Sequence, residues 1–158
     1  MRIVLILALF FASGPALALS CMRPDVARSY QNAAQAEDIY VVVRGRLTFD
    51  EGKLPKSDGT AQGPETVTIP ARFDGKALSK VGFETAFARD ITLEVVCFGP
   101  WCGGAKSGVP YLAFLEKRGE DYVMVADPCG SWAFSEPSEE QVNQVESCMA
   151  GSGCDPLE

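Results

Sequence analysis

The chain contains no histidine among its 158 residues. The absence of imidazole excludes Ser–His–Asp and Cys–His catalysis, and also the usual zinc sites, which recruit histidine. No two cysteines have the C-x-x-C spacing of thioredoxin-type redox motifs, because Ala105 stands where Cys102 would need a second thiol. Positive charge is scarce too, and the net charge of −7 disfavours nucleic acid as a partner. We therefore expect a non-enzymatic protein without a metal ion or a cofactor.

Long apolar runs are absent except at the start of the chain. A positive Arg2 and a ten-residue apolar core precede a small-x-small cleavage site that ends at Ala18, which predicts a signal peptide over residues 1–18. We expect an exported protein, periplasmic or secreted, with no transmembrane segment in the mature chain. A cut after Ser20 is a second option, and it would make Cys21 the first residue. A lipid anchor at Cys21 is disfavoured, because Ala18 stands where a lipoprotein site wants leucine.

Six cysteines lie beyond the predicted signal peptide: Cys21, Cys97, Cys102, Cys129, Cys148 and Cys154. An even number of cysteines in an exported chain indicates disulfide bonds, since the compartments outside the cytosol are oxidising. We expect three bridges, each contributing about 2–4 kcal/mol to stability.

Alternating apolar side chains predict five β-strands, because a strand with one buried face repeats every second residue. The strands are expected at residues 39–49, 66–73, 90–97, 111–115 and 122–126. A short polar segment with a glycine separates the last two, which predicts an antiparallel hairpin. Asp74-Gly75-Lys76 is expected to form a turn, and Phe83 and Phe87 are expected in a loop before the third strand.

Two other segments show helical spacing of apolar residues. Residues 24–37 carry a stripe diluted by polar side chains, whereas Ser138 opens a capping box with Gln141, and Gly151 is placed to end that helix. Five strands with a capping helix suit a small closed β-barrel of the OB type. The expected fold class is therefore mainly β: a five-stranded OB-type barrel with a C-terminal helix and three disulfides.

The positions of the cysteines suggest two of the bridges. Cys102 lies just before the predicted hairpin and Cys129 just after it, and an antiparallel hairpin brings its outer ends together. We therefore predict a bridge between them. A flexible spacer of five residues separates Cys148 from Cys154, so that the tail can fold back and pair with the helix.

Several features occur in an order that is typical of one family. They are Cys21 followed by Pro24, the strand YVVVRGRL from Tyr40, a cysteine that closes the third strand, the strand Tyr111–Leu115, the segment Asp127-Pro128-Cys129, and a cysteine in the C-terminal helix. This order resembles the netrin-like module shared by the tissue inhibitors of metalloproteinases, an OB barrel tied by disulfides. The resemblance covers about residues 21–149, and we expect a netrin-like OB domain over residues 21–154.

The resemblance implies a protein-binding role, with an extracellular or envelope metalloprotease as a candidate partner. The inhibitors open with a C-x-C pair whose first cysteine presents its free α-amine and carbonyl to the protease zinc. Here Arg23 stands where the second cysteine would be, and Cys102 and Cys154 are additional. The resemblance therefore supports the fold more than it supports inhibition.

The resemblance also bears on the remaining bridge. Elimination leaves Cys21–Cys97, which agrees with how the family ties its opening segment to the barrel. The strongest rival combines Cys21–Cys129 with Cys97–Cys102, because the family also links its opening segment to the end of the fifth strand.

The leading hypothesis is an exported netrin-like binding domain, with Cys21, Met22, Arg23 and Trp101 as the expected partner-binding residues. The alternatives are a thiol–disulfide or metal-handling envelope protein that uses Cys97 and Cys102, and a purely structural envelope module.

Overall fold

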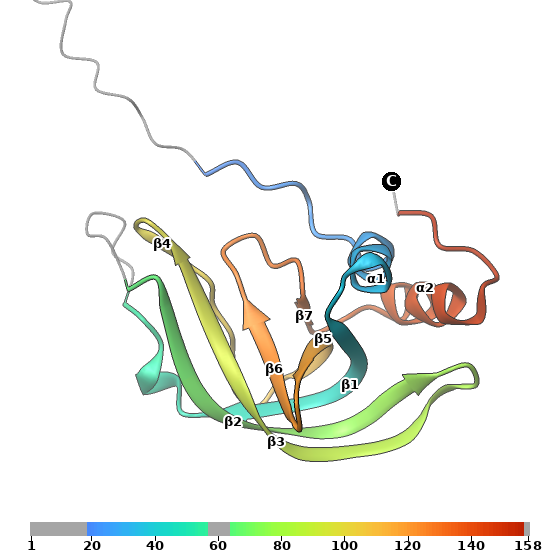
Figure 1. Ribbon diagram of the computed structural model, residues 1–158, viewed down its shortest axis with the longest axis horizontal. Coiled ribbons are helices and arrows are strands. Elements are labelled where there is room, and N and C mark those ends of the chain that lie inside the picture. The colour runs from blue at the N-terminus through green and yellow to red at the C-terminus, as the bar shows by residue number, and fades with distance from the viewer. Residues whose placement is uncertain (1–18, 57–63, 157–158) are drawn as a thin grey trace, which may run out of the picture.

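The computed structural model describes residues 19–56 and 64–156, so the predicted signal peptide over residues 1–18 lies outside the described residues. Within them, strands make up most of the regular structure (Figure 1). The elements are α1 (Val26–Gln35), β1 (Ile39–Phe49), the 3₁₀ helix η1 (Glu51–Lys53), β2 (Thr66–Ser79), β3 (Gly82–Phe98), β4 (Trp101–Cys102), β5 (Pro110–Arg118), β6 (Asp121–Ala126), β7 (Ala133–Ser135) and α2 (Glu139–Ala150).

Five of the strands form a hydrogen-bonded ring. β1 pairs with β2 and β2 with β3 in antiparallel fashion, β3 runs parallel to β6, and β6 is antiparallel to β5, which returns to β1. Among the described strands, β4 pairs only with β3, and β7 pairs only with β5. The predicted fold class is confirmed: a mainly β protein with a five-strand, barrel-like ring, a C-terminal helix and three disulfides. The short strands β4 and β7 were not predicted.

Large apolar side chains fill the inside of the ring. Each ring strand contributes at least one that has no exposed surface, and these include Leu47, Phe73, Leu93, Leu115 and Met124. Burying a side chain of this size stabilises the fold by about 1.5–3 kcal/mol. The alternation that predicted the five strands thus marks the inward face of the ring.

A second apolar cluster lies outside the ring, where α1 and α2 cover β1 and β5 (Figure 1). Val26 from α1 and Val145 from α2 pack there with Leu112 and Phe114 of β5. Because Leu115 points into the ring, β5 has both of its faces buried. The helices therefore convert a strand that would face water into an internal one.

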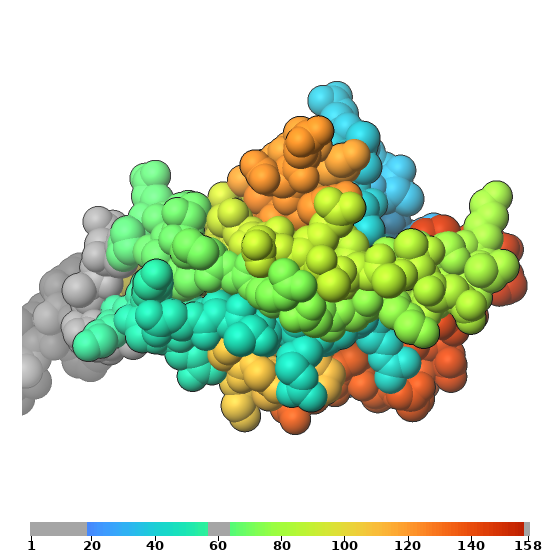
Figure 2. All heavy atoms as spheres, turned by 90° about the horizontal axis from the view of Figure 1, so that it is seen from below, coloured from blue at the N-terminus to red at the C-terminus, as the bar shows by residue number. Residues whose placement is uncertain are grey.

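β2 and β3 extend past the ring as one long hairpin, and Figure 2 shows it running along the length of the molecule. The predicted turn at Asp74-Gly75-Lys76 is wrong, because these residues continue β2. The predicted loop around Phe83 and Phe87 is also wrong, since both residues lie in β3. The chain reverses instead between Ser79 and Gly82.

Gly75 lies in β2 at a point where the backbone of β1 comes very close to it. Gly45 and Gly75 are directly opposite each other, and the register of β1 on β2 shows no bulge at either. A Cβ atom on Gly45 would lie 2.3 Å from Asp74 O and 2.8 Å from the Phe73 ring. Glycine in a strand often marks such a close approach of two backbones.

Both helices begin at residues that cap them. Asp25 precedes α1 and accepts a hydrogen bond from Arg28 N–H, at 2.9 Å. Ser138 and Gln141 form the predicted capping box of α2, and Gly151 ends it in the left-handed conformation. Such caps satisfy backbone groups that have no partner within the helix.

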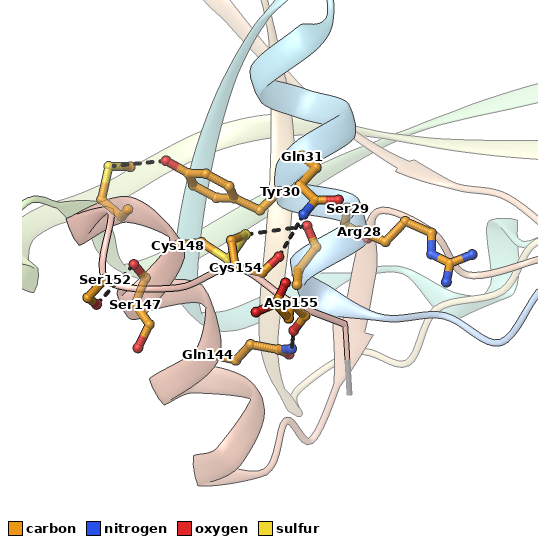
Figure 3. The surroundings of a disulfide bond; sticks show 12 residues. Arg28, Ser29, Tyr30, Gln31, Gln144, Ser147, Cys148, Ser152, Cys154 and Asp155 are labelled. Carbon is orange, nitrogen blue, oxygen red and sulfur yellow. Dashed lines mark hydrogen bonds between the residues drawn. A yellow bond between two sulfur atoms is a disulfide. The ribbon is translucent and has the colours of Figure 1, made fainter. Parts of the chain in front are cut away.

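The disulfides are Cys21–Cys129, Cys97–Cys102 and Cys148–Cys154. The predicted Cys148–Cys154 bridge is confirmed, and Figure 3 shows it between α2 and the tail. The predicted bridges Cys21–Cys97 and Cys102–Cys129 are wrong, and the rival pairing is the one observed.

The reason for the error is local. Cys102 does lie near the end of β6, since a Cβ atom on the adjacent Gly103 would lie 1.9 Å from Ala126 O. However, β4 folds back on β3 and places Cys102 directly opposite Cys97. The unpredicted strand β4 thus decides which neighbour Cys102 reaches.

Replacing Gly45 by alanine should lower the free energy of unfolding by about 1–3 kcal/mol, because the added methyl group overlaps backbone that cannot move aside. Urea denaturation measures the change. Gly104→Ala is the matched control, since a Cβ atom at Gly104 meets no atom within 4 Å. Equal free energies of unfolding for the two variants would contradict the close approach of the two backbones at Gly45.

Titration of the denatured, non-reduced mature protein should find no thiol, and should find six after reduction, because all six cysteines are bridged. Peptide mapping by mass spectrometry should recover the three observed pairs. A cross-link that joins the Cys102 peptide to the Cys129 peptide would overturn this pairing.

Candidate functional site

Three segments far apart in the sequence meet at one end of the ring. β3 and β6 run parallel over residues 92–95 and 123–126, so the chain leaves both strands on the same side. The β3–β4 hairpin follows β3, and residues 127–131 follow β6. The Cys21–Cys129 bridge ties residues 19–25 to this second loop. All three segments lie along the top of the molecule in Figure 1, and we call them the bridged end.

The tip of the β3–β4 hairpin is a two-residue turn. Gly99 has a φ of 60° and precedes Pro100, which suits the first position of the primed turns that close tight hairpins. Phe98 and Trp101 pair across the turn. Directly opposite residues of an antiparallel pair share one face, so their two rings lie on the same side of the hairpin.

Apolar side chains are exposed at the bridged end. Met22 is 70% exposed, Phe98 is 49% exposed and Leu19 is 36% exposed. Only Ile39 and Val81 are comparable among the other described residues, and Val81 is at the far tip of the β2–β3 hairpin. Exposed apolar side chains on segments that leave the same end of the ring are candidates for an interaction surface.

Next to the N-terminal segment lies a hollow of about 320 Å³ between the starts of α1 and α2. Met22, Arg23, Arg28 and Gln141 are among the residues that line it. Arg28 Nη1 donates a hydrogen bond to Met22 Sδ at 3.1 Å. Asp25 also lines the hollow but caps α1 through the Arg28 N–H. Two guanidinium groups thus lie beside an apolar side chain in an otherwise acidic protein.

The loop after β6 is held in shape by Asp127. Its carboxylate accepts hydrogen bonds from Cys129 N–H at 2.7 Å and from Ser131 N–H at 3.2 Å. Ser29 of α1 donates its hydroxyl hydrogen to Ser131 O. The position of Cys129, and through its bridge that of Cys21, is therefore fixed by the ring and by α1 together.

The Cys21 sulfur is bonded to Cys129. A lipid anchor would need the same sulfur for a thioether, so the bridged form of the protein cannot carry one. Three disulfides fit an oxidising compartment outside the cytosol.

An ion-pair network lies elsewhere, near the β5–β6 turn. Arg118 bonds both Glu94, at 2.8 Å, and Glu116, at 2.6 Å. The hydrogen bond from the Arg118 guanidinium lowers the pKa of the Glu116 carboxyl. Both carboxylates are partners of the same arginine, so the cluster is explained as a cross-strand ion-pair network.

Residues 19–56 and 64–156 contain no group of three or more histidine, cysteine, aspartate or glutamate side chains placed to hold a metal ion. None of the helices in these residues has the length and apolar character needed to span a bilayer.

The structure brings all four predicted partner-binding residues to the bridged end. Cys21, Met22 and Arg23 are exposed, while Trp101 is half-buried. The partner-binding residues expected from the sequence did not include Phe98 or Arg28. The Gly99-Pro100 pair was a turn signal that could have identified Phe98, but nothing in the sequence indicated that Arg28 reaches back to Met22.

Comparisons with protein-family models, with curated proteins and with solved structures found no match for this chain.

Proposed function

We propose that this chain is an exported, non-enzymatic binding domain that recognises a protein partner through the bridged end. The observation that carries the proposal is that three segments with the exposed Met22 and Phe98 and the half-buried Trp101 leave one end of the ring, where Cys21–Cys129 joins two of them and Cys97–Cys102 closes the third. A surface that is rigid before binding loses less conformational freedom when a partner docks. Exposed apolar groups on such a frame gain most from being covered.

The chemistry of the surface defines the partner. Met22 and Phe98 offer apolar contacts, and the guanidinium groups of Arg23 and Arg28 flank the thioether. The matching surface is an apolar patch with a carboxylate beside it. Arginine suits this role because its planar group binds carboxylates through two parallel hydrogen bonds.

Membership of the netrin-like class is part of the proposal. It is supported by the five-strand ring, the C-terminal helix and the Cys21–Cys129 bridge, which joins the opening segment to the end of β6 as that class does. We assign the bridged end, which contains the opening cysteine, as the binding surface.

Replacing Met22 and Phe98 together by serine should weaken binding by at least about thirtyfold, because even one buried apolar anchor of an interface contributes about 2 kcal/mol or more. The partner is first captured by a photo-crosslinking residue at position 98, identified, and titrated against the purified mature domain. Arg23→Glu should weaken binding too, and the affinity of the unaltered domain should fall as salt is raised.

Val81→Ser is the matched control, because Val81 is 78% exposed and lies at the far hairpin tip. We expect its affinity to stay within about twofold of the unaltered domain, as for a surface substitution away from the interface. An unchanged affinity of the Met22→Ser, Phe98→Ser variant would contradict the assignment, and so would an equal loss for Val81→Ser.

Metalloprotease inhibition by zinc chelation should be weak or absent. An open zinc site accepts an amine and a carbonyl oxygen from one residue as a five-membered chelate, so the chain would have to begin at Cys21. Cleavage after Ala18 leaves Leu19 and Ser20 in front, and the Cys21 nitrogen is then an amide. Arg23 in place of a cysteine also leaves one bridge fewer to hold the segment.

N-terminal sequencing of the exported protein and a zinc-protease assay test this expectation together. A chain that starts at Cys21 and inhibits at sub-micromolar concentration, with loss of inhibition on acetylation of its amine, would prove it wrong. Inhibition that survives acetylation would indicate binding through the bridged end without use of the zinc.

A further inference from the structure

We propose that the Cys97–Cys102 bridge is a thiol–disulfide exchange site, which a dithiol reductant opens while the other two bridges stay closed. The exchange reaction at Cys97–Cys102 does not depend on the proposed function. Only its consequence, control of the binding surface by reduction, rests on that function.

The fold does not need this bridge. Cys97 and Cys102 are five residues apart, whereas the Cys21–Cys129 bridge spans 108 residues. A disulfide restricts the unfolded chain less when it closes a shorter loop. Cys97 also stays in β3 without it, since its N–H donates to Glu65 O at 2.9 Å. Opening Cys97–Cys102 therefore leaves the ring intact.

The strand pairing at the hairpin tip, in contrast, is short. β4 has two residues and pairs only with β3 among the described strands. One further hydrogen bond, from Gly103 N–H to Val96 O at 2.8 Å, extends the pairing. A two-stranded ribbon of this length is not stable in water by itself. Reduction should thus loosen Phe98 and Trp101 without unfolding the ring.

The bridge also joins two Cα atoms that are unusually close together. The hydrogen bond between Gly103 and Val96 makes the adjacent Cys97 and Cys102 a non-hydrogen-bonded pair, in which opposite Cα atoms approach most closely. These Cα atoms are 3.9 Å apart, closer than the 4.5 Å of Cys148–Cys154. Disulfides usually join Cα atoms about 4.4–6.8 Å apart, and bridges forced outside that range are more easily reduced.

The two sulfurs differ in access. Cys97 is 7% exposed, whereas Cys102 is half-buried at the rim. A reductant thiolate therefore attacks the Cys102 Sγ, the sulfur–sulfur bond breaks, and Cys97 leaves as a thiolate that takes up a proton. The second thiol of the reductant then displaces Cys102, whose thiolate takes up the other proton. In sum, the dithiol gives two electrons and two protons and becomes a disulfide, and the protein gains two thiols.

The Cys148–Cys154 bridge is an internal control. It closes a loop of similar length, with a sequence separation of six, and it too joins a buried cysteine to a half-buried one. Its tail, however, is held on both sides (Figure 3). Gln31 Nε2 donates to Cys154 O at 2.6 Å, and Gln144 Nε2 donates to Asp155 O at 2.7 Å. We therefore expect it to resist reduction longer.

The test titrates the folded mature protein with dithiothreitol, blocks free thiols by alkylation, and maps the labelled peptides. Cys97 and Cys102 should be fully labelled at a reductant concentration at which less than about a tenth of the other four cysteines react, with far-ultraviolet circular dichroism unchanged. If Cys97–Cys102 opens together with or after either of the other bridges, the exchange site is refuted. This readout needs no partner, so it does not depend on the proposed function.

A Cys97→Ser, Cys102→Ser double variant tests the consequence for binding. Its affinity for the captured partner should fall by about three- to tenfold, because the tip must be ordered on docking. The matched Cys148→Ser, Cys154→Ser variant should bind as the unaltered domain does. Unchanged binding by the first variant, with selective labelling of Cys97 and Cys102, would overturn control of the surface while leaving the exchange site in place.

Discussion

The parallel pairing of β3 with β6 is the contact on which the rest of the structure depends. Every other pairing in the ring is antiparallel, and this one joins two antiparallel halves into a closed circuit. It also sends the chain out of β3 and β6 on the same side. Without this pairing, the β3–β4 hairpin and the loop that contains Cys129 would not be placed side by side. Ring closure and the candidate binding surface thus have one cause.

Side-chain alternation was enough to predict the ring strands, because each strand has one face inside the ring. The prediction failed where a strand has no side chain on the face inside the ring. Gly75 shows no inward side chain, since the β1 backbone occupies that space, and so the middle of β2 looked like a turn. The helix α2 was predictable for a different reason: its capping box, Ser138 with Gln141, is a local signal that needs no tertiary contact.

The candidate site was predictable in its residues but not in its connections. A cysteine near the start of the chain and a tryptophan beside Cys102 were visible, and both lie at the bridged end. The choice between Cys97 and Cys129 as the partner of Cys102 depended on a two-residue strand, β4, too short for any periodic signal. The bond from Arg28 to Met22 crosses the start of a helix and has no sequence signature either.

The distance between paired strands along the chain has a consequence for how the protein matures. β1 pairs with β5 across more than sixty residues of sequence, so the ring closes only after most of the chain is available. Cys21 and Cys129 come together only after the ring has closed, whereas the cysteines of the other two pairs are close to each other in sequence. In oxidative refolding, the 108-residue bridge is therefore the one whose appearance reports that the ring is complete.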